Sequence, residues 1–285
     1  CVHSCFSFYF IDRSLCGYIC IFSVEGQKGM NYQMEIHIQK TLENIQLDVA
    51  LQSNHYSTLV VGGNGSGKST LLRCVVGEIV PDKGVISMKE EPFFHSEEGL
   101  CLPIHQRKIG YVPQQDVLFN CFDNLDNISI GLWKHSSKSK EEIRDMAHRL
   151  LDELGFANLG CQFPQYCSGG QRRIISIARA LLMKPKLLLL DEPLHSIDLP
   201  TKIYLVNYIL GYIQKNKIPC LWVTHDGIVL KNHNPEHTLY IEEGKGALLN
   251  NWTEESLILQ TLRLSCMQNL STGLTWHYQM VQRLE

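Results

Sequence analysis

A phosphate-binding loop constrains the fold of this 285-residue chain more than any other feature. The pattern G-x-x-x-x-G-K-[ST] is filled by Gly62, Gly63, Asn64, Gly65, Ser66, Gly67, Lys68, Ser69 and Thr70. The segment 57–61 before it reads as a buried strand, and 70–76 after it reads as the first turns of a helix. In that context backbone N–H groups and the helix dipole point at a phosphate, Lys68 reaches the β- and γ-phosphates, and Ser69 ligates Mg²⁺. The sequence therefore predicts a nucleoside triphosphate site.

A second element of such a site ends the apolar run 187–191. Four consecutive leucines followed by Asp191 predict a strand that is buried on both faces, with a carboxylate at its end. Asp191 can hold Mg²⁺ there, directly or through water. Glu192, one residue further on, can polarise a water for in-line attack on the γ-phosphate.

The remaining pattern predicts an α/β P-loop NTPase fold with a mainly parallel core sheet. Alternating residues over 34–38 and 45–51 predict an antiparallel β subdomain. Helical spacing over 141–154 predicts a helical insert at 122–165, and a second helix follows at 172–183. A helix over 199–215, a strand over 220–224 and a turn at 242–246 complete the alternation.

Bulk properties narrow the class of protein. A net charge of −3 gives no electrostatic reason to expect nucleic acid as a partner. The eleven cysteines lack zinc-site spacing, so we expect free thiols in a reducing compartment. The sequence contains no run of 18 or more uncharged apolar residues, so it predicts no membrane-spanning helix.

A second anion site is suggested by Ser168, Gly169, Gly170 and Gln171, which precede the helix at 172–183. One nucleotide does not need two such sites in one subunit. Two interpretations stay open at this point: an ordinary serine N-cap followed by glycines, or a site that faces the nucleotide of a second chain.

These motifs, taken in order, resemble the ATP-binding cassette (ABC) ATPases from about residue 34 to 250. The resemblance is carried by 62–70, Gln114, the 168–171 tetrad, 187–193, 195–198 and 223–226. It implies ATP hydrolysis with Mg²⁺ in a homodimer, or a paired cassette, that sandwiches two ATP molecules between the phosphate loop and the 168–171 tetrad. The segments 99–112 and 191–202 further resemble the ATPase subunits of molybdate importers, with sulfate and iron(III) importers as close relatives.

The resemblance also implies roles for single residues. Gln114 would sense Mg²⁺ and the attacking water and link the site to a membrane partner. Asp198 would cross the dimer interface, and His225 would hydrogen-bond the γ-phosphate. Three positions depart from the family pattern: Cys167 stands where Leu is usual, Ile174 where Arg is usual, and 33–54 holds no aromatic residue to stack on adenine. His37 or Tyr32 are the available substitutes.

The expected organisation has three parts. Residues 1–29 read as a foreign N-terminal extension, 30–250 as the ATP-binding domain with a helical subdomain at about 122–183, and 251–285 as a tail too short for an oxyanion-binding regulatory domain. The expected location is peripheral, on the cytoplasmic face of the membrane, with a permease helix in a groove beside Gln114. Alternatives are an importer ATPase for sulfate, iron(III) or polyamine, a cassette acting on DNA or ribosomes, and a degraded cassette that binds ATP with little turnover.

Overall fold

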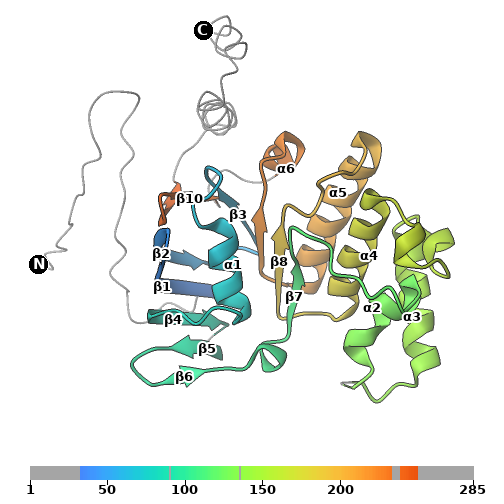
Figure 1. Ribbon diagram of the computed structural model, residues 1–285, viewed down its shortest axis with the longest axis horizontal. Coiled ribbons are helices and arrows are strands. Elements are labelled where there is room, and N and C mark those ends of the chain that lie inside the picture. The colour runs from blue at the N-terminus through green and yellow to red at the C-terminus, as the bar shows by residue number, and fades with distance from the viewer. Residues whose placement is uncertain (1–32, 90, 135, 233–237, 250–285) are drawn as a thin grey trace, which may run out of the picture.

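The computed structural model describes residues 33–89, 91–134, 136–232 and 238–249. The predictions for 1–29, Tyr32 and 251–285 lie outside these residues. The described strands form one sheet of eleven in the order β6-β5-β4-β1-β2-β11-β10-β3-β9-β8-β7 (Figure 1). Their bounds are β1 Met34–Leu42, β2 Ile45–Ser53, β3 Ser57–Val61, β4 Lys83–Met88, β5 Glu91–His95, β6 Leu100–Cys101, β7 Ile109–Val112, β8 Leu187–Asp191, β9 Cys220–Val223, β10 Thr238–Glu242 and β11 Lys245–Leu249.

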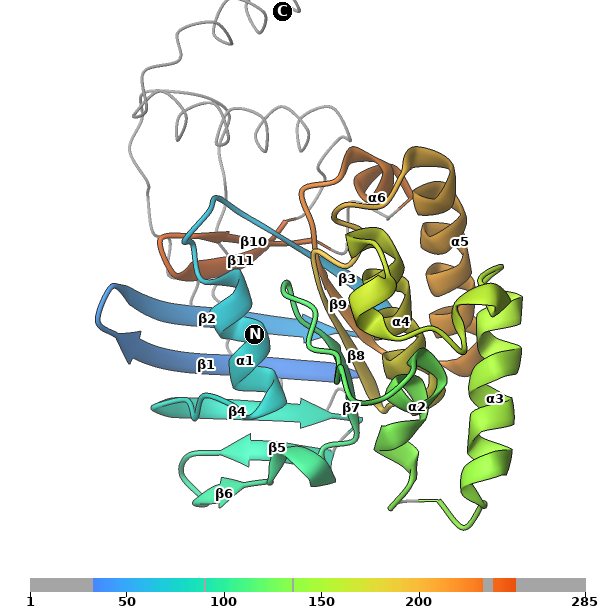
Figure 2. The same ribbon diagram turned by 45° about the vertical axis from the view of Figure 1, so that its right-hand side comes forward.

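Some of the α-helices cover the two faces of the central strands, and others form a separate group at one side of the molecule (Figure 2). Their bounds are α1 Lys68–Val76, α2 Asn124–Ser129, α3 Lys140–Glu153, α4 Gly169–Leu182, α5 Leu199–Asn216 and α6 Gly227–Asn232. Short 3₁₀ turns occupy 104–106, 130–132, 157–159 and 164–166.

The core of the sheet is parallel, as the sequence predicted. β10, β3, β9, β8 and β7 pair in parallel, whereas β1, β2, β4, β5 and β6 form antiparallel pairs. The all-leucine strand β8 is fully buried because it is packed on both faces. Leu187 and Leu189 join the cluster that contains α1, and Leu188 and Leu190 join the cluster that contains α4. The sheet therefore holds α1 and α4 on opposite faces.

The antiparallel subdomain follows from a two-residue periodicity. Met34, Ile36 and Ile38 are fully buried on the face that carries α1, while the intervening His37 is exposed. β1 and β2 are longer than predicted and pair from Met34↔Ser53 to Leu42↔Ile45. β5 and β6, which extend this edge of the sheet, were not predicted.

The helical subdomain is built on α4. α2 and α3 pack against it and bury apolar residues at helical spacing. α3 begins with a capping box between Ser139 and Glu142, and Arg144 on α3 pairs with Asp123 and Asp126 at the start of α2. Within the described ranges no helix has both the length and the apolar character needed to cross a bilayer.

Candidate functional site

The phosphate loop closes around its own lysine. α1 begins at Lys68, directly after the loop 62–67, and the lysine side chain is buried. Its ammonium donates hydrogen bonds to the carbonyls of Gly62 at 2.8 Å and Gly63 at 2.7 Å. Burial lowers the Lys68 pKa, and the nearby Glu192 and Asp191 partly oppose that shift. A buried cation held by main-chain oxygens next to a helix N-terminus suits a phosphate, which can replace those weak partners.

The loop also contains a buried polar atom without a partner. The Ser66 hydroxyl is inaccessible to solvent and finds no hydrogen-bond partner among the residues that the structure describes. Such an orphaned group costs free energy unless a ligand satisfies it. The loop is supported from outside by the β10–β11 turn, where the Gly244 N–H donates to the Ser66 carbonyl at 3.0 Å.

Two oxygen ligands for a divalent cation meet where β8 ends. Asp191 is 3% exposed and is hydrogen-bonded to the Ser69 side chain in the first turn of α1. Burial raises the Asp191 pKa, the Ser69 hydrogen bond opposes the rise, and Glu192 adds to it. A carboxylate and a hydroxyl form a hard donor set of the kind that Mg²⁺ uses together with substrate phosphates and water. These residues therefore fit a magnesium ion.

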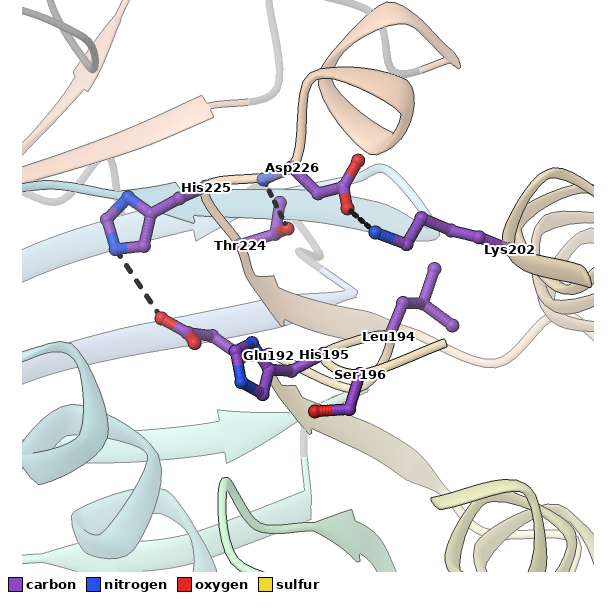
Figure 3. Close-up of a pocket in the computed structure, with 8 residues that line it drawn as sticks. All are labelled: Glu192, Leu194, His195, Ser196, Lys202, Thr224, His225 and Asp226. Carbon is purple, nitrogen blue, oxygen red and sulfur yellow. Dashed lines mark hydrogen bonds and ion pairs between the residues drawn. The ribbon is translucent and has the colours of Figure 1, made fainter. Parts of the chain in front are cut away.

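Glu192 and His225 face each other and both line a cavity of about 210 Å³ (Figure 3). Glu192 Oε1 lies 3.5 Å from His225 Nε2, at the outer limit of a hydrogen bond. Both ring nitrogens of His225 are buried and have no full hydrogen-bond partner within the described part of the chain. The cavity is lined by Glu192, Leu194, His195, Ser196, Lys202, Thr224, His225 and Asp226.

The electrostatics of this cavity keep His225 neutral. Burial lowers the His225 pKa, the Lys68 ammonium lowers it further, and Glu192 partly opposes both effects. A neutral imidazole has one donor and one acceptor nitrogen, so it can hydrogen-bond a phosphate oxygen and a second group at the same time.

Gln114 lies at the neighbouring strand end. β7 and β8 pair in parallel, with Val112 opposite Leu190. Gln114 and Glu192 each come two residues after this pair, so they lie at the same edge of the sheet. The Gln114 side chain is exposed, and its backbone carbonyl is held by the Arg173 guanidinium at 2.7 Å. Glu192 has a left-handed backbone with φ of 48°, which is costly for a residue other than glycine.

The 168–171 tetrad forms the N-terminus of α4. The Ser168 hydroxyl accepts from the Gln171 N–H at 3.2 Å, and the Gln171 side chain accepts from the Ser168 N–H at 2.8 Å. This capping box starts the helix at Gly169, three residues before the predicted Arg172. α4 and α1 lie on opposite faces of the sheet, so the tetrad and the phosphate loop are held by different layers.

Asp198 is exposed and caps α5 by accepting from the Thr201 N–H at 3.1 Å. Hydrogen bonds from the Thr201 backbone and side chain lower the Asp198 pKa. Its carboxylate is therefore charged at neutral pH.

Within the described residues, neither candidate for stacking on adenine is found at the phosphate loop. His37 lies on the exposed face of β1, away from the layer that contains α1, and Tyr32 lies outside the described residues. Instead, the aliphatic side chains of Ile45 and Leu47 lie against Gly67. The start of β2, next to the β1–β2 turn, thus brings apolar but non-aromatic surface to the loop.

Sequence reasoning assigned no role to two residues around the site, Arg173 and Lys202. Arg173 is buried and bonded to the loops of Gln114 and Glu192, although the sequence showed only that an arginine pair precedes the unusual Ile174. Lys202 on α5 pairs with Asp226, directly after His225 (Figure 3). Only a prediction of long-range contacts could have joined these residues.

Comparisons with known proteins point to one family. The model of the ABC transporter family matches residues 42–195. The molybdenum import ATP-binding protein ModC of Vibrio parahaemolyticus is 37% identical over 194 residues, which are 67% of this chain and 50% of that protein. ModC of Pasteurella multocida is 34% identical over 213 residues, which are 74% of this chain and 58% of that protein. The chain thus spans little more than half the length of these curated relatives.

The fold has a solved counterpart. The dimeric, post-hydrolysis structure of the ATP-binding cassette MJ0796 bound to ADP and Pi superposes with a TM-score of 0.64. The two sequences are 23% identical, and the match covers 77% of this chain and 99% of that one.

Proposed function

Because the chain belongs to the ABC transporter family, we propose that it binds MgATP and hydrolyses it to power import through a separate permease. The observation that carries this proposal is the meeting of Lys68, Asp191, Glu192 and His225 around one buried site. They come from three segments of the chain, the start of α1, the end of β8 and the residues after β9, and each has the chemistry that phosphoryl transfer to water requires.

Binding would rest on the phosphate loop. The backbone N–H groups of 62–70 and the Lys68 ammonium would hold the phosphates, with the Ser66 hydroxyl gaining the partner that it lacks. Ser69, Asp191 and Gln114 would hold Mg²⁺, whose charge neutralises the phosphates during transfer. Adenine would lie against the aliphatic β1–β2 turn at Ile45.

Hydrolysis would rest on Glu192 and His225. The Glu192 carboxylate lines the cavity beside His225 and would orient the attacking water and accept its proton. His225, kept neutral by burial, would donate one ring N–H to a γ-phosphate oxygen.

The arrangement of layers supports a dimer. The 168–171 tetrad is a second helix N-terminus that cannot share the nucleotide of α1, because the sheet separates the two helices. In a head-to-tail homodimer or paired cassette the tetrad would cover the partner's nucleotide, and the exposed Asp198 would reach across the interface.

The exposed apolar surface beside Gln114 supports a membrane partner. Val117 and Phe119 are 59% and 43% exposed on the segment that leads from β7 into the helical subdomain. A permease helix from a membrane subunit would cover them, which would place the chain peripherally on the cytoplasmic face. We propose molybdate or a related oxyanion as the cargo, because the matching relatives are named molybdenum import proteins.

A steady-state ATPase assay tests this function. Wild-type protein should hydrolyse ATP in the presence of Mg²⁺, and Glu192→Gln should lower the rate on the order of 10²-fold or more. Arg149→Gln, on the exposed face of α3, is the matched control and should leave the rate unchanged. Binding without turnover in the wild type would instead identify a degraded cassette.

The cargo needs a separate test. Co-expression with candidate permeases and recovery of the membrane subunit would identify the partner, and reconstituted vesicles would then report which oxyanion stimulates hydrolysis. Stimulation by sulfate, iron(III) or polyamine in place of molybdate would overturn the assignment of cargo and leave the ATPase intact.

A further inference from the structure

Arg173 joins the helix α4 to two loops of the candidate site. Its side chain is 3% exposed, and its two terminal nitrogens donate four hydrogen bonds. Nη1 donates to the Pro113 carbonyl at 2.6 Å and to Asp116 Oδ1 at 3.0 Å. Nη2 donates to the Gln114 carbonyl at 2.7 Å and to the Glu192 carbonyl at 3.1 Å. One planar group therefore fixes both loops to the same helix.

The network leaves little freedom to these groups. Removing a guanidinium from water is unfavourable unless its donors are satisfied, and a rigid fork satisfies them only in one orientation. Asp116 supplies the opposite charge, and its Oδ1 also accepts from the Ser176 hydroxyl at 3.1 Å, one helical turn further along α4. The loop 113–116 is thus bound to α4 at two successive positions.

The carbonyl of Glu192 is a sensitive point of attachment. Glu192 has the left-handed φ of 48°, which persists only where the surroundings impose it. Its carbonyl accepts from Arg173 and from the His195 N–H at 3.2 Å, and its own N–H donates to Val223 at 2.9 Å. Releasing the Arg173 bond would let this residue relax and would turn its carboxylate away from His225.

Arg173 lies two residues after Gln171, about one turn from the start of α4. The capping box of Ser168 and Gln171 makes this end of the helix well formed, so it moves with Arg173 as one body. A ligand that shifts the 168–171 tetrad must also shift the carbonyls of Gln114 and Glu192.

From this geometry we infer that Arg173 is a positioning residue that connects the two nucleotide sites of a dimer. The inference rests on the proposed function, in which the tetrad of one chain covers the partner's ATP. Closure of the tetrad on that ATP then sets Gln114 and Glu192 at the chain's own ATP. Hydrolysis at one site thereby depends on occupancy of the other.

The test compares Arg173→Met and Arg173→Lys with the control Arg179→Met. Arg179, also on α4, donates to the Val117 carbonyl at 2.7 Å, so its removal loosens the same loop without touching Gln114 or Glu192. Arg173→Met should lower kcat on the order of 10²-fold, as misplacement of reacting groups does. The Kd for ATP should stay within about threefold, because Lys68 and the loop 62–70 are untouched. Arg173→Lys, which keeps the charge but not the fork, should recover part of kcat.

The ATP dependence of the rate gives the decisive reading. Wild-type protein should show a Hill coefficient above one, and Arg173→Met should show a coefficient of about one at its lower rate. A variant with unchanged kcat and unchanged cooperativity would overturn the inference, and so would a Kd that rises as much as kcat falls. If Arg173→Met fails to fold, the Arg173→Lys variant carries the same comparison.

Hydrogen exchange separates failure of this inference from failure of the proposed function. A non-hydrolysable ATP analogue should protect the amides of 62–70 and of 113–117 in wild-type protein, whether or not that protein turns over ATP. Arg173→Met should keep the first protection and lose the second. Retained protection at 113–117 refutes the inference alone, whereas absence of wild-type protection at 62–70 refutes nucleotide binding.

Discussion

The turn between β10 and β11 supports the phosphate loop, and Gly244→Ala should break that support. Gly244 has φ of +82°, its N–H donates to the Ser66 carbonyl at 3.0 Å, and its carbonyl accepts from the Asp48 N–H at 2.7 Å. An added β-carbon would lie 2.1 Å from the Gln46 carbonyl oxygen. The turn must therefore move away from β2, and both hydrogen bonds lengthen.

The size of the effect follows from these contacts. A left-handed alanine costs about 1 kcal/mol relative to glycine. Two weakened main-chain hydrogen bonds add about 1 kcal/mol each. We therefore expect Gly244→Ala to lower the free energy of unfolding by about 3 kcal/mol, and to weaken ATP binding about tenfold because Ser66 shifts with the turn.

Gly99→Ala is the matched control. Gly99 also has a left-handed backbone, with φ of +65°, but a β-carbon there would meet nothing within 4 Å. Gly99→Ala should lower the free energy of unfolding only by the cost of a left-handed alanine, about 1 kcal/mol, and should leave the Kd for ATP unchanged. Urea unfolding gives the free energies and titration with a fluorescent ATP analogue gives the affinities. Equal losses of stability and affinity in the two variants would show that the contacts of Gly244 do not support the phosphate loop.

Three buried or half-buried ionisable groups give further predictions. Arg107 is fully buried, has no carboxylate partner among the described residues, and donates to the Cys74 and Val75 carbonyls at the end of α1. Arg107→Met should lower the free energy of unfolding, measured in urea, by about 2 kcal/mol, whereas Arg149→Met should change it by less than about 0.5 kcal/mol. The pKa of His225 is lowered in the folded chain, so the unfolded chain takes up a proton first as pH falls below about 6.5, and the free energy of unfolding declines there. His225→Gln should flatten that decline in unfolding curves measured against pH. An unchanged slope would contradict the lowered pKa of His225. The raised pKa of Asp191 means that its charge costs stability above the ordinary aspartate pKa; Asp191→Asn should therefore raise the melting temperature at neutral pH without Mg²⁺, while ATP affinity becomes insensitive to EDTA.

Local sequence signals predicted much of the fold. β3 begins and ends where the predicted strand 57–61 does, and β8 coincides with the four leucines and Asp191 of 187–191. In both cases a short run of consecutive apolar residues is the signal, because a strand covered on both faces shows no alternation. The helical spacing at 141–154 likewise gave α3 to within one residue at each end.

Other elements depend on contacts between distant segments. β5 contains Pro92 and β6 has two residues, so neither has a usable periodicity, and pairing with β4 alone defines them. The start of α4 was placed too late because glycines disfavour helix interiors, whereas the capping box of Ser168 outweighs that preference.

The candidate site divides in the same way. Lys68, Ser69, Asp191, Glu192 and His225 were found from motifs, and the structure brings them together; their roles in hydrolysis stay predictions. The partners of Arg173 come from 19 to 60 residues away, so no local pattern reveals them. The arginine pair directly before the unusual Ile174 was the available signal.

The central claim is that two chains enclose ATP between the loop 62–70 of one and the 168–171 tetrad of the other. Light scattering with nucleotide analysis on Glu192→Gln, with MgATP present, tests it most directly. We expect a particle of twice the chain's mass that retains two ATP per dimer and reverts to monomer in Glu192→Gln/Ser168→Arg. A monomer that retains ATP, or a dimer that forms equally well without nucleotide, would contradict it.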